Sequence, residues 1–229
     1  MAVRIGSIAA TFLALMVATP GHARSETSPC QLAAHPEETV DLGAWPFGSR
    51  EVIIESDPAR SAWMALLRQI SAEDVPLPRD WKPHLTRVRT EPLLAKLTVV
   101  NDLVNRIPYK RRVDWVHPRV FLKRGGDCDG AAVTKYMLLR GLGITSADMR
   151  IALVYWPERK ARHAILMVRG KDEKLSRYIL DINHARVVSA IYHSEYVPLM
   201  SVNENGVWRH KKTSARITNH FLNPRIIRP

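Results

Sequence analysis

The spacing of apolar residues along the chain predicts helices in its first half. A first helix is expected after Asp57-Pro58, a pair typical of an N-cap followed by a first-turn proline. A second is expected from near Thr90 to the residue before Pro108, because proline disfavours helical backbone in the residue that precedes it. The two apolar faces at helical spacing are formed by Ala62, Trp63, Leu66, Leu67 and Ile70, and by Leu93, Leu94, Leu97, Val100 and Val104.

A third helix is expected to begin at Cys128, directly after Gly125-Gly126-Asp127. It is expected to end near Gly141 and Gly143, because glycine is typical of the position that follows a helix. The segment from Val75 to Pro83, which lies between the first two helices, is too rich in proline for a helix or a central strand. We therefore expect it to be a linker.

The second half of the chain contains segments rich in Val, Ile, Leu and Tyr that are separated by charged turns. These segments predict three strands: Arg150 to Trp156, His163 to Arg169 and Tyr178 to Asn183. Helices that precede a run of consecutive strands indicate an α+β fold with an antiparallel sheet. The stretch from Ser201 to Pro229 is basic and weakly patterned, and it predicts no particular element.

The N-terminus has the pattern of an export signal. Arg4 supplies a positive charge, Ile8 to Ala18 an apolar core, and Pro20 to Ala23 a cleavage zone. The apolar core is shorter than the about 20 residues of a transmembrane helix. We therefore expect a periplasmic product without stable membrane insertion, with an uncleaved anchor as the alternative. The expected division of the chain is a signal peptide over 1–23, an irregular arm over 24–50 and one domain over 51–229.

The chain is basic, with 34 Lys and Arg against 22 Asp and Glu and a formal charge of +12. Such an excess can attract nucleic acid, an anionic membrane or an acidic protein. The basic residues are nevertheless dispersed, no nucleic-acid-binding signature occurs, and export argues against a nucleic-acid partner. The charge is therefore interpreted as a solvated positive surface, and no nucleic-acid partner is expected.

Two cysteines, Cys30 and Cys128, are too few for a disulfide framework or a four-cysteine zinc site. Cys30 falls in the irregular arm, whereas Cys128 opens a predicted helix, where backbone N–H groups and the helix dipole stabilise a thiolate. The two glycines before Cys128 permit a sharp turn whose free amides are donors for an oxyanion. A buried structural thiol and a disulfide between the two cysteines are the alternatives. We expect a free, reactive Cys128 with a lowered pKa and an incidental Cys30.

A cysteine nucleophile requires a base, and the base requires a group that orients it. If the last two predicted strands form a hairpin centred on Asp172, His163 lies directly opposite Asp181. Opposed residues of antiparallel strands have Cβ atoms roughly 4.5–5.5 Å apart, so the carboxylate can accept a hydrogen bond from the imidazole. His184 is the rival base because it is close to Asp181 in the sequence.

Several short segments, taken in chain order, match one known pattern. They are Val99–Asn105, Trp115–Leu122, Gly126–Asp129, Ala131–Tyr136 and Leu180–Asn183. Together they resemble the bacterial transglutaminase-like cysteine peptidases, a group that includes the LapG-type periplasmic proteases. The resemblance implies a papain-like or transglutaminase-like fold and a protein or peptide substrate, such as an outer-membrane or surface protein. It also implies that Cys128 is the nucleophile, His163 the base and acid, and Asp181 the residue that orients His163.

The same resemblance implies a calcium site. In LapG-type members acidic residues beside the nucleophile bind calcium, and Asp127 and Asp129 occupy those positions. The family pattern usually has two acidic residues after the cysteine, whereas here Gly130 follows Asp129. Carboxylates suit calcium, but a full site takes six to eight oxygens. The alternatives are a helix N-cap for Asp127 and, for Asp129, a salt bridge with a base such as Lys123 or Arg124.

The expected function is a cysteine peptidase, and two alternatives remain open. The first alternative is transglutaminase or amidase chemistry on side-chain or cell-wall amides, which uses the same thiol. The second alternative is an inactive binding module of the same fold, which the missing second acid favours and the intact Cys, His and Asp disfavour. The sequence has no His-Glu-x-x-His zinc helix, Gly-x-Ser-x-Gly elbow or phosphate-binding loop.

Overall fold

The computed structural model describes residues 49–55, 58–70, 75–111, 115–170, 177–190 and 195–211. All of these residues belong to one compact unit of the chain. The expectations for the signal peptide, for almost all of the arm, for Cys30 and for the cap at Asp57 concern residues outside this described part.

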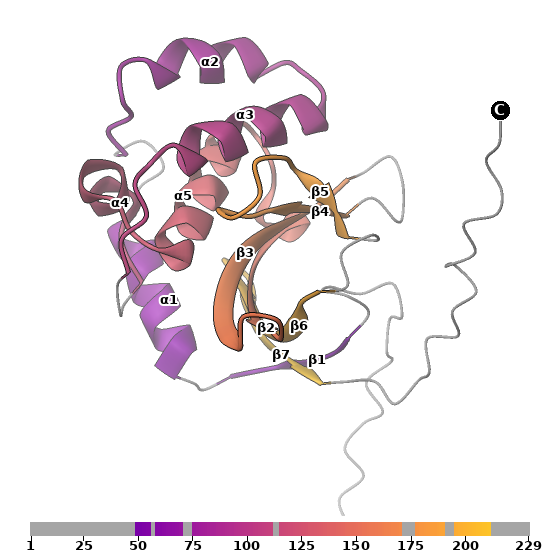
Figure 1. Cartoon of the computed structure of the whole chain (residues 1–229). Coiled ribbons are helices and arrows are strands. Elements are labelled where there is room, and N and C mark those ends of the chain that lie inside the picture. The colour runs from indigo at the N-terminus through magenta and orange to yellow at the C-terminus, as the bar shows by residue number, and fades with distance from the viewer. Residues whose placement is uncertain are drawn as a thin grey trace, which may run out of the picture. The chain divides into compact units, whose positions relative to one another are not determined.

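The helices precede most of the strands, as the sequence predicts (Figure 1). The expected helices correspond to α1, α3 and α5, and α5 begins at Cys128 as predicted. Their bounds are α1 Pro58–Gln69, α2 Trp81–Val88, α3 Leu93–Asn105, α4 Pro118–Arg124 and α5 Cys128–Gly141, followed by a short 3₁₀ helix, η1, at Ser146–Asp148. Within the described residues, no helix combines the length and the apolar character needed to cross a membrane.

Proline explains where the helix predictions were wrong. Part of the expected linker forms α2, because Pro83 lies in the first turn, where a missing backbone N–H breaks no hydrogen bond. The helix α3 begins three residues later than expected, because Pro92 precedes it and disfavours helical backbone at Glu91. The unpredicted helix α4 begins at Pro118, and the Nδ1 atom of its N-cap residue His117 accepts from the Arg119 amide at 3.1 Å.

The strands form one antiparallel sheet in the order β1-β7-β6-β2-β3-β4-β5. Their bounds are β1 Arg50–Ile53, β2 Met149–Trp156, β3 Ala161–Arg169, β4 Arg177–Leu180, β5 Val188–Ser189, β6 Val197–Asn203 and β7 Gly206–Lys211. The three expected strands are present as β2, β3 and a shorter β4. The stretch that begins at Ser201, for which no element was predicted, completes β6 and forms β7. The fold is therefore α+β, as predicted.

The register of the β3–β4 pair differs from the predicted one. Leu166 pairs with Leu180, so His163 and Asp181 are not directly opposite each other. Continuing this register would set Asp181 opposite Ile165, two residues from His163. The observed pairs, such as Arg169 with Arg177, are centred on position 173 instead of the predicted 172. A shift by two residues keeps every side chain on its predicted face of the sheet.

The sheet separates two apolar clusters. Alternate residues of β3, such as Ala164 and Leu166, pack with the helices in the larger cluster, which contains the fully buried Trp63 of α1. Ile165 and Met167 belong to a smaller cluster together with Trp156 and Tyr196. Helix α5 is buried along most of its length, from Gly130 to Leu139, and packs against α3, α4, β2 and β3. The fold therefore holds the start of α5 next to β3.

Candidate active site

The turn before α5 is shaped by close backbone contacts. Gly125 has a φ of 75°, and a Cβ atom at this position would lie 2.3 Å from the carbonyl oxygen of Pro108. The following residue, Gly126, accepts a hydrogen bond from the Lys110 amide at 2.7 Å and forms a bridge with Tyr109. Only glycine fits at residue 125, because the backbone there has a positive φ and a Cβ atom would clash with the Pro108 oxygen. The segment 108–110 therefore fixes the turn that presents Cys128.

The thiol of Cys128 is partly buried at the first residue of α5. Its sulfur receives a hydrogen bond from the backbone amide of Ala164 in β3, and it lies 3.7 Å from Oδ1 of Asp129. Burial, followed by the charge of Asp129, raises the pKa of Cys128 to about 12. The prediction of a lowered thiol pKa was therefore wrong, because burial and the neighbouring carboxylates outweigh the helix start.

His163 is buried in β3 and bonded to the predicted orienting acid. Its Nε2 atom lies 2.8 Å from Oδ1 of Asp181, and Nδ2 of Asn183 lies 3.2 Å from the same nitrogen. The imidazole ring lies 5.6 Å from the ring centre of Trp156 and 5.9 Å from that of Tyr196. Because Nε2 is engaged in this way, Nδ1 is the nitrogen available to a substrate or a thiol.

The carboxylate of Asp181 is fully buried and accepts several hydrogen bonds. Besides His163, its donors include the hydroxyl of Tyr196, at 2.5 Å from Oδ2, and the backbone and side-chain amides of Asn183, at 2.8 and 3.4 Å from Oδ1. Burial acts to raise the pKa of Asp181, but the bond and charge of His163 and the other donors lower it to about 2. Asp181 is thus an ionised, fixed acceptor for the imidazole.

The rival histidine, His184, lies beside the other oxygen of the same carboxylate. Its Nε2 atom is 3.9 Å from Oδ2 of Asp181, 3.3 Å from Oε1 of Glu195 and 3.4 Å from the hydroxyl of Tyr196. The contacts described for the Cys128 sulfur are with Ala164 and Asp129. The sulfur therefore lies beside the part of β3 that carries His163, the residue before Ala164, and the choice of His163 over His184 as the base stays a prediction.

Sequence reasoning missed two residues that fix Asp181. The Asp-x-Asn spacing of Asp181 and Asn183 is typical of a turn in which a side chain accepts from the backbone two residues later, so Asn183 had a local signal. Tyr196 had none, because it reaches Asp181 from the segment before β6. The catalytic roles of Cys128, His163 and Asp181 remain predictions, although the structure gathers these residues at one place.

The two expected calcium ligands lie on either side of Cys128. Asp127 is buried at the N-cap position of α5, but its side chain makes no capping hydrogen bond. Burial, followed by the charge of Asp127, raises the pKa of Asp129, so the two carboxylates are close enough to repel each other. In the described part of the chain, Asp129 forms no ion pair with Lys123 or Arg124.

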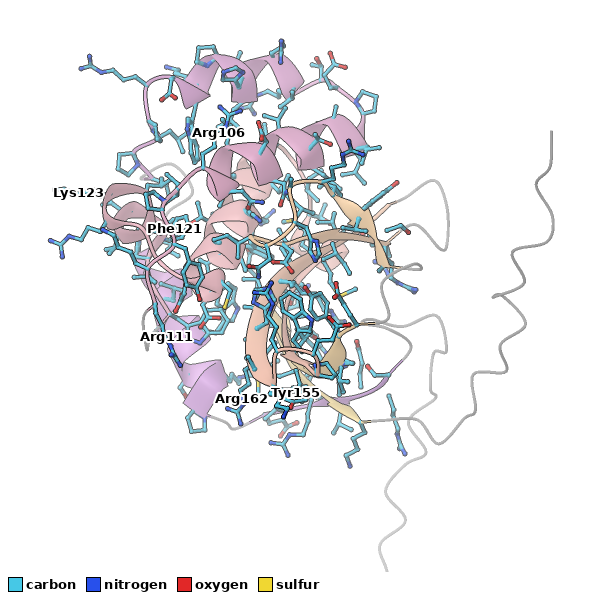
Figure 2. The ribbon with its side chains drawn as sticks, in the orientation of Figure 1. Arg106, Arg111, Phe121, Lys123, Tyr155 and Arg162 are labelled. Carbon is cyan, nitrogen blue, oxygen red and sulfur yellow. The ribbon has the colours of Figure 1, made fainter. Side chains whose placement is uncertain are left out.

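The donor chemistry of Asp127 and Asp129 fits two ligands of a calcium ion, because both supply hard oxygen atoms and their repulsion favours a cation between them. No group of three or more His, Cys, Asp or Glu suited to a metal occurs among the described residues. A third carboxylate at position 130 would require the buried ring of Phe121 to shift, because a Cβ atom there would lie 2.7 Å from its Cδ2 atom. Figure 2 shows Phe121 on the α4 side of this helix.

A cysteine at a helix start beside a hydrogen-bonded His–Asp pair is the arrangement expected of a cysteine proteinase. The sequence profile of the bacterial transglutaminase-like cysteine proteinases (BTLCP) matches residues 79–215. The chain therefore belongs to this family. A search of curated proteins gave no match.

Solved structures of LapG from Legionella pneumophila share the fold. One is 23% identical in sequence, with a TM-score of 0.55, and covers 61% of this chain and 88% of LapG. A calcium-bound structure is 22% identical, with a TM-score of 0.54 and coverage of 66% and 91%. An EGTA-treated structure is 24% identical, with a TM-score of 0.56 and coverage of 64% and 89%. These similarities establish the transglutaminase-like architecture.

Proposed function

We propose that this proteinase is exported to the periplasm and cleaves a protein substrate through Cys128, His163 and Asp181. The observation that carries the proposal is the 2.8 Å bond between His163 Nε2 and Asp181 Oδ1, next to the residue whose amide contacts the Cys128 sulfur. This bond fixes the imidazole and leaves Nδ1 for proton transfer.

In the proposed reaction, the Cys128 sulfur attacks the carbonyl carbon of a peptide bond while Nδ1 of His163 accepts the thiol proton. Because the thiol pKa is about 12 in the free protein, attack requires this base. Backbone amides at the start of α5 have no partner within the helix and can donate to the developing oxyanion. Ionised Asp181 stabilises the imidazolium that forms.

The tetrahedral intermediate then collapses, and the carbon–nitrogen bond breaks. His163 gives its proton to the leaving amine, and the acyl group remains on the Cys128 sulfur as a thioester. A water molecule next attacks the thioester carbonyl while His163 accepts one of its protons. Release of the new carboxyl terminus returns the proton to the sulfur and completes the cycle.

Calcium belongs to this proposal through Asp127 and Asp129, and a LapG relative has been solved with calcium bound. When bound, the ion would supply positive charge that offsets the two carboxylates beside the thiol. Their charges raise the pKa of Cys128, so a cation there would favour the thiolate.

The proposed location and substrate rest on other observations than those that support the proposed reaction. The n-region, apolar core and cleavage zone of residues 1–23 support export. A proteinase in the periplasm meets periplasmic and outer-membrane proteins, so a protein of the outer membrane or cell surface is the proposed substrate.

The test incubates the mature protein with periplasmic and outer-membrane extracts and compares it with Cys128→Ala. We expect at least one polypeptide to be cut only by the intact protein, with a free new N-terminus. Cleavage by both proteins, or by neither, would contradict the proposal. Addition of a primary amine separates the two reaction types, because acyl transfer would leave that amine attached to the product whereas hydrolysis leaves a carboxylate.

A further inference from the structure

A buried lysine lies on the same helix as the nucleophile. Lys135 follows Cys128 by seven residues, about two helical turns, and is 1% exposed. Its Nζ atom donates to Oδ1 of Asn101 in α3 at 2.8 Å. A buried amine is costly unless it is hydrogen-bonded, so this position requires its partner. Neither the proposed reaction nor the calcium ligands use Lys135.

The partner of Lys135 holds the loop that carries the orienting acid. Nδ2 of Asn101 lies within hydrogen-bonding distance of the carbonyl oxygens of His184, at 3.1 Å, and Ala185, at 3.4 Å. One turn later in α3, Nδ2 of Asn105 contacts the carbonyl oxygens of Asp181, at 2.9 Å, and His184, at 3.0 Å. Two asparagines of α3 therefore hold the segment 181–185, which follows β4.

The network continues from this loop into the proposed catalytic residues. Asp181, the first residue of the loop, binds Nε2 of His163. Lys135 also interacts electrostatically with this carboxylate. Burial lowers the pKa of Lys135 to about 7, and the negative charge of Asp181 acts against that decrease. One connected set of contacts thus runs from α5 through α3 to the loop and the imidazole. In Figure 1, α3 lies next to both α5 and the segment between β4 and β5.

We propose that Lys135 and Asn101 are positioning residues, which couple the helix of the nucleophile to the Asp181 loop and thereby hold His163 in place for Cys128. This inference rests on the proposed function, because it assigns the coupling a role in catalysis. A displacement of a catalytic group by about 1 Å can cost on the order of 100-fold in rate. A network that holds the loop can therefore control the rate without contacting the substrate.

The first test uses Lys135→Met, which keeps the length of the apolar side chain and removes the amine. We expect kcat for a cleaved peptide to fall about 10- to 100-fold while KM changes less than about 3-fold, because Lys135 does not contact substrate. Asn101→Leu should cause a similar loss, and the double variant should lose little more than either single variant, because the two residues act as one unit.

Arg140→Met is the matched control on the same helix. Arg140 donates to both oxygens of Glu204, at 2.8 and 3.1 Å, and to the Ile144 carbonyl, so its described hydrogen bonds involve neither α3 nor the loop. The control should lower the melting temperature while leaving kcat per folded molecule within about 2-fold. If Lys135→Met behaves like Arg140→Met, Lys135 is only structural and the inference is wrong.

A readout that needs no activity separates this inference from the proposed function. The ¹⁵N chemical shifts of the His163 imidazole, measured in a Cys128→Ala background, report the bond between Nε2 and Asp181. We expect Lys135→Met to shift the Nε2 signal and Arg140→Met to leave it unchanged. An unchanged signal in folded Lys135→Met would overturn the inference even if the proteinase is active. A shifted signal in a protein that cleaves nothing would retain the coupling and reject only the proposed function.

Asn101→Asp covers the case in which Lys135→Met fails to fold. The aspartate keeps an oxygen acceptor for Lys135 but removes the amide that donates to His184 and Ala185. The inference predicts reduced kcat and a shifted His163 signal in this variant. Wild-type values of both would contradict it.

Discussion

The buried ring of Phe121 occupies the space that a Cβ atom on Gly130 would need. That atom would lie 2.7 Å from Cδ2 of Phe121 and 3.2 Å from a methyl group of Val116. The resemblance to the family leads us to expect a second acidic residue at this position, and in this chain the packing of α4 against α5 disfavours it. The departure from the family pattern is therefore built into the core next to the proposed calcium ligands.

Introducing the missing acid should thus harm the protein. We expect Gly130→Asp to lower the free energy of unfolding by about 1–3 kcal/mol or more, because the new side chain overpacks a buried contact. Urea denaturation measures this change. Gly141→Ala at the other end of α5 is the control, because a Cβ atom there meets nothing within 4 Å, and it should be neutral or stabilising. A Gly130→Asp protein as stable as the wild type would refute this packing argument.

Cys128 should be the only cysteine needed for activity. Cys128→Ser is expected to abolish cleavage, because a serine hydroxyl is a much weaker nucleophile at this site. Cys30→Ser should retain at least about half of the wild-type kcat, since Cys30 lies in the N-terminal arm expected from the sequence. Alkylation with mass-spectrometric mapping, combined with peptide cleavage, measures both. A comparable loss in the two variants would contradict the assignment.

The two histidines near Asp181 should differ strongly in their effect on kcat. His163→Gln removes the proposed base and is expected to reduce kcat by about 10²–10⁴-fold, the range typical of general acid–base catalysis. His184→Gln should reduce kcat less than about 10-fold, because its contacts are with Asp181 Oδ2, Glu195 and Tyr196. The opposite order would make His184 the base.

Asp181 should make folding stability depend on pH under acidic conditions. Its pKa of about 2 lies below the ordinary value of about 3.9, so its contribution is present above pH ~4 and is lost as the pH falls toward 2. Tyr196→Phe removes a donor to this carboxylate, raises its pKa and should move acid unfolding to a higher pH. Circular dichroism melts between pH 2 and 7 test this. If the melting temperature of Tyr196→Phe fell with decreasing pH just as that of the wild type does, the role of the hydroxyl would be contradicted.

Calcium should support both activity and stability. We expect a chelator to lower kcat and the melting temperature and added Ca²⁺ to restore them, because Asp127 and Asp129 otherwise repel each other beside the thiol. Asp129→Ala should remove the response. Calorimetry without detectable Ca²⁺ binding at millimolar concentration, together with full activity in chelator, would rule out the metal.

Local patterns predicted the elements that carry the proposed catalytic residues. The start of α5 follows from the glycines before Cys128, and β3 and β4 follow from their Val, Ile, Leu and Tyr content. The predicted contact between His163 and Asp181 is present although the predicted register was wrong by two residues. A shift by an even number of residues leaves both side chains on the same face of the sheet.

The other features depend on tertiary contacts that no local window contains. The strand β1 pairs with β7 across more than 150 residues of sequence, and Tyr196 reaches Asp181 from the segment before β6. The pKa of Cys128 was predicted in the wrong direction for the same reason. The helix start is visible in the sequence, but the degree of burial is not.

The pairing of β1 with β7 also limits how far the N-terminus of this proteinase can be truncated. The family profile begins at residue 79, so it leaves out β1 and α1. The strand β1 forms one edge of the sheet, and the indole nitrogen of Trp63 in α1 donates to the Asn203 carbonyl at 2.8 Å. A fragment that begins at the profile boundary would keep every proposed catalytic residue and leave the hydrogen-bonding edge of β7 uncovered. Such open edges pair with other chains. Recombinant production should therefore begin before Ser49, because a shorter fragment is expected to aggregate with its site intact.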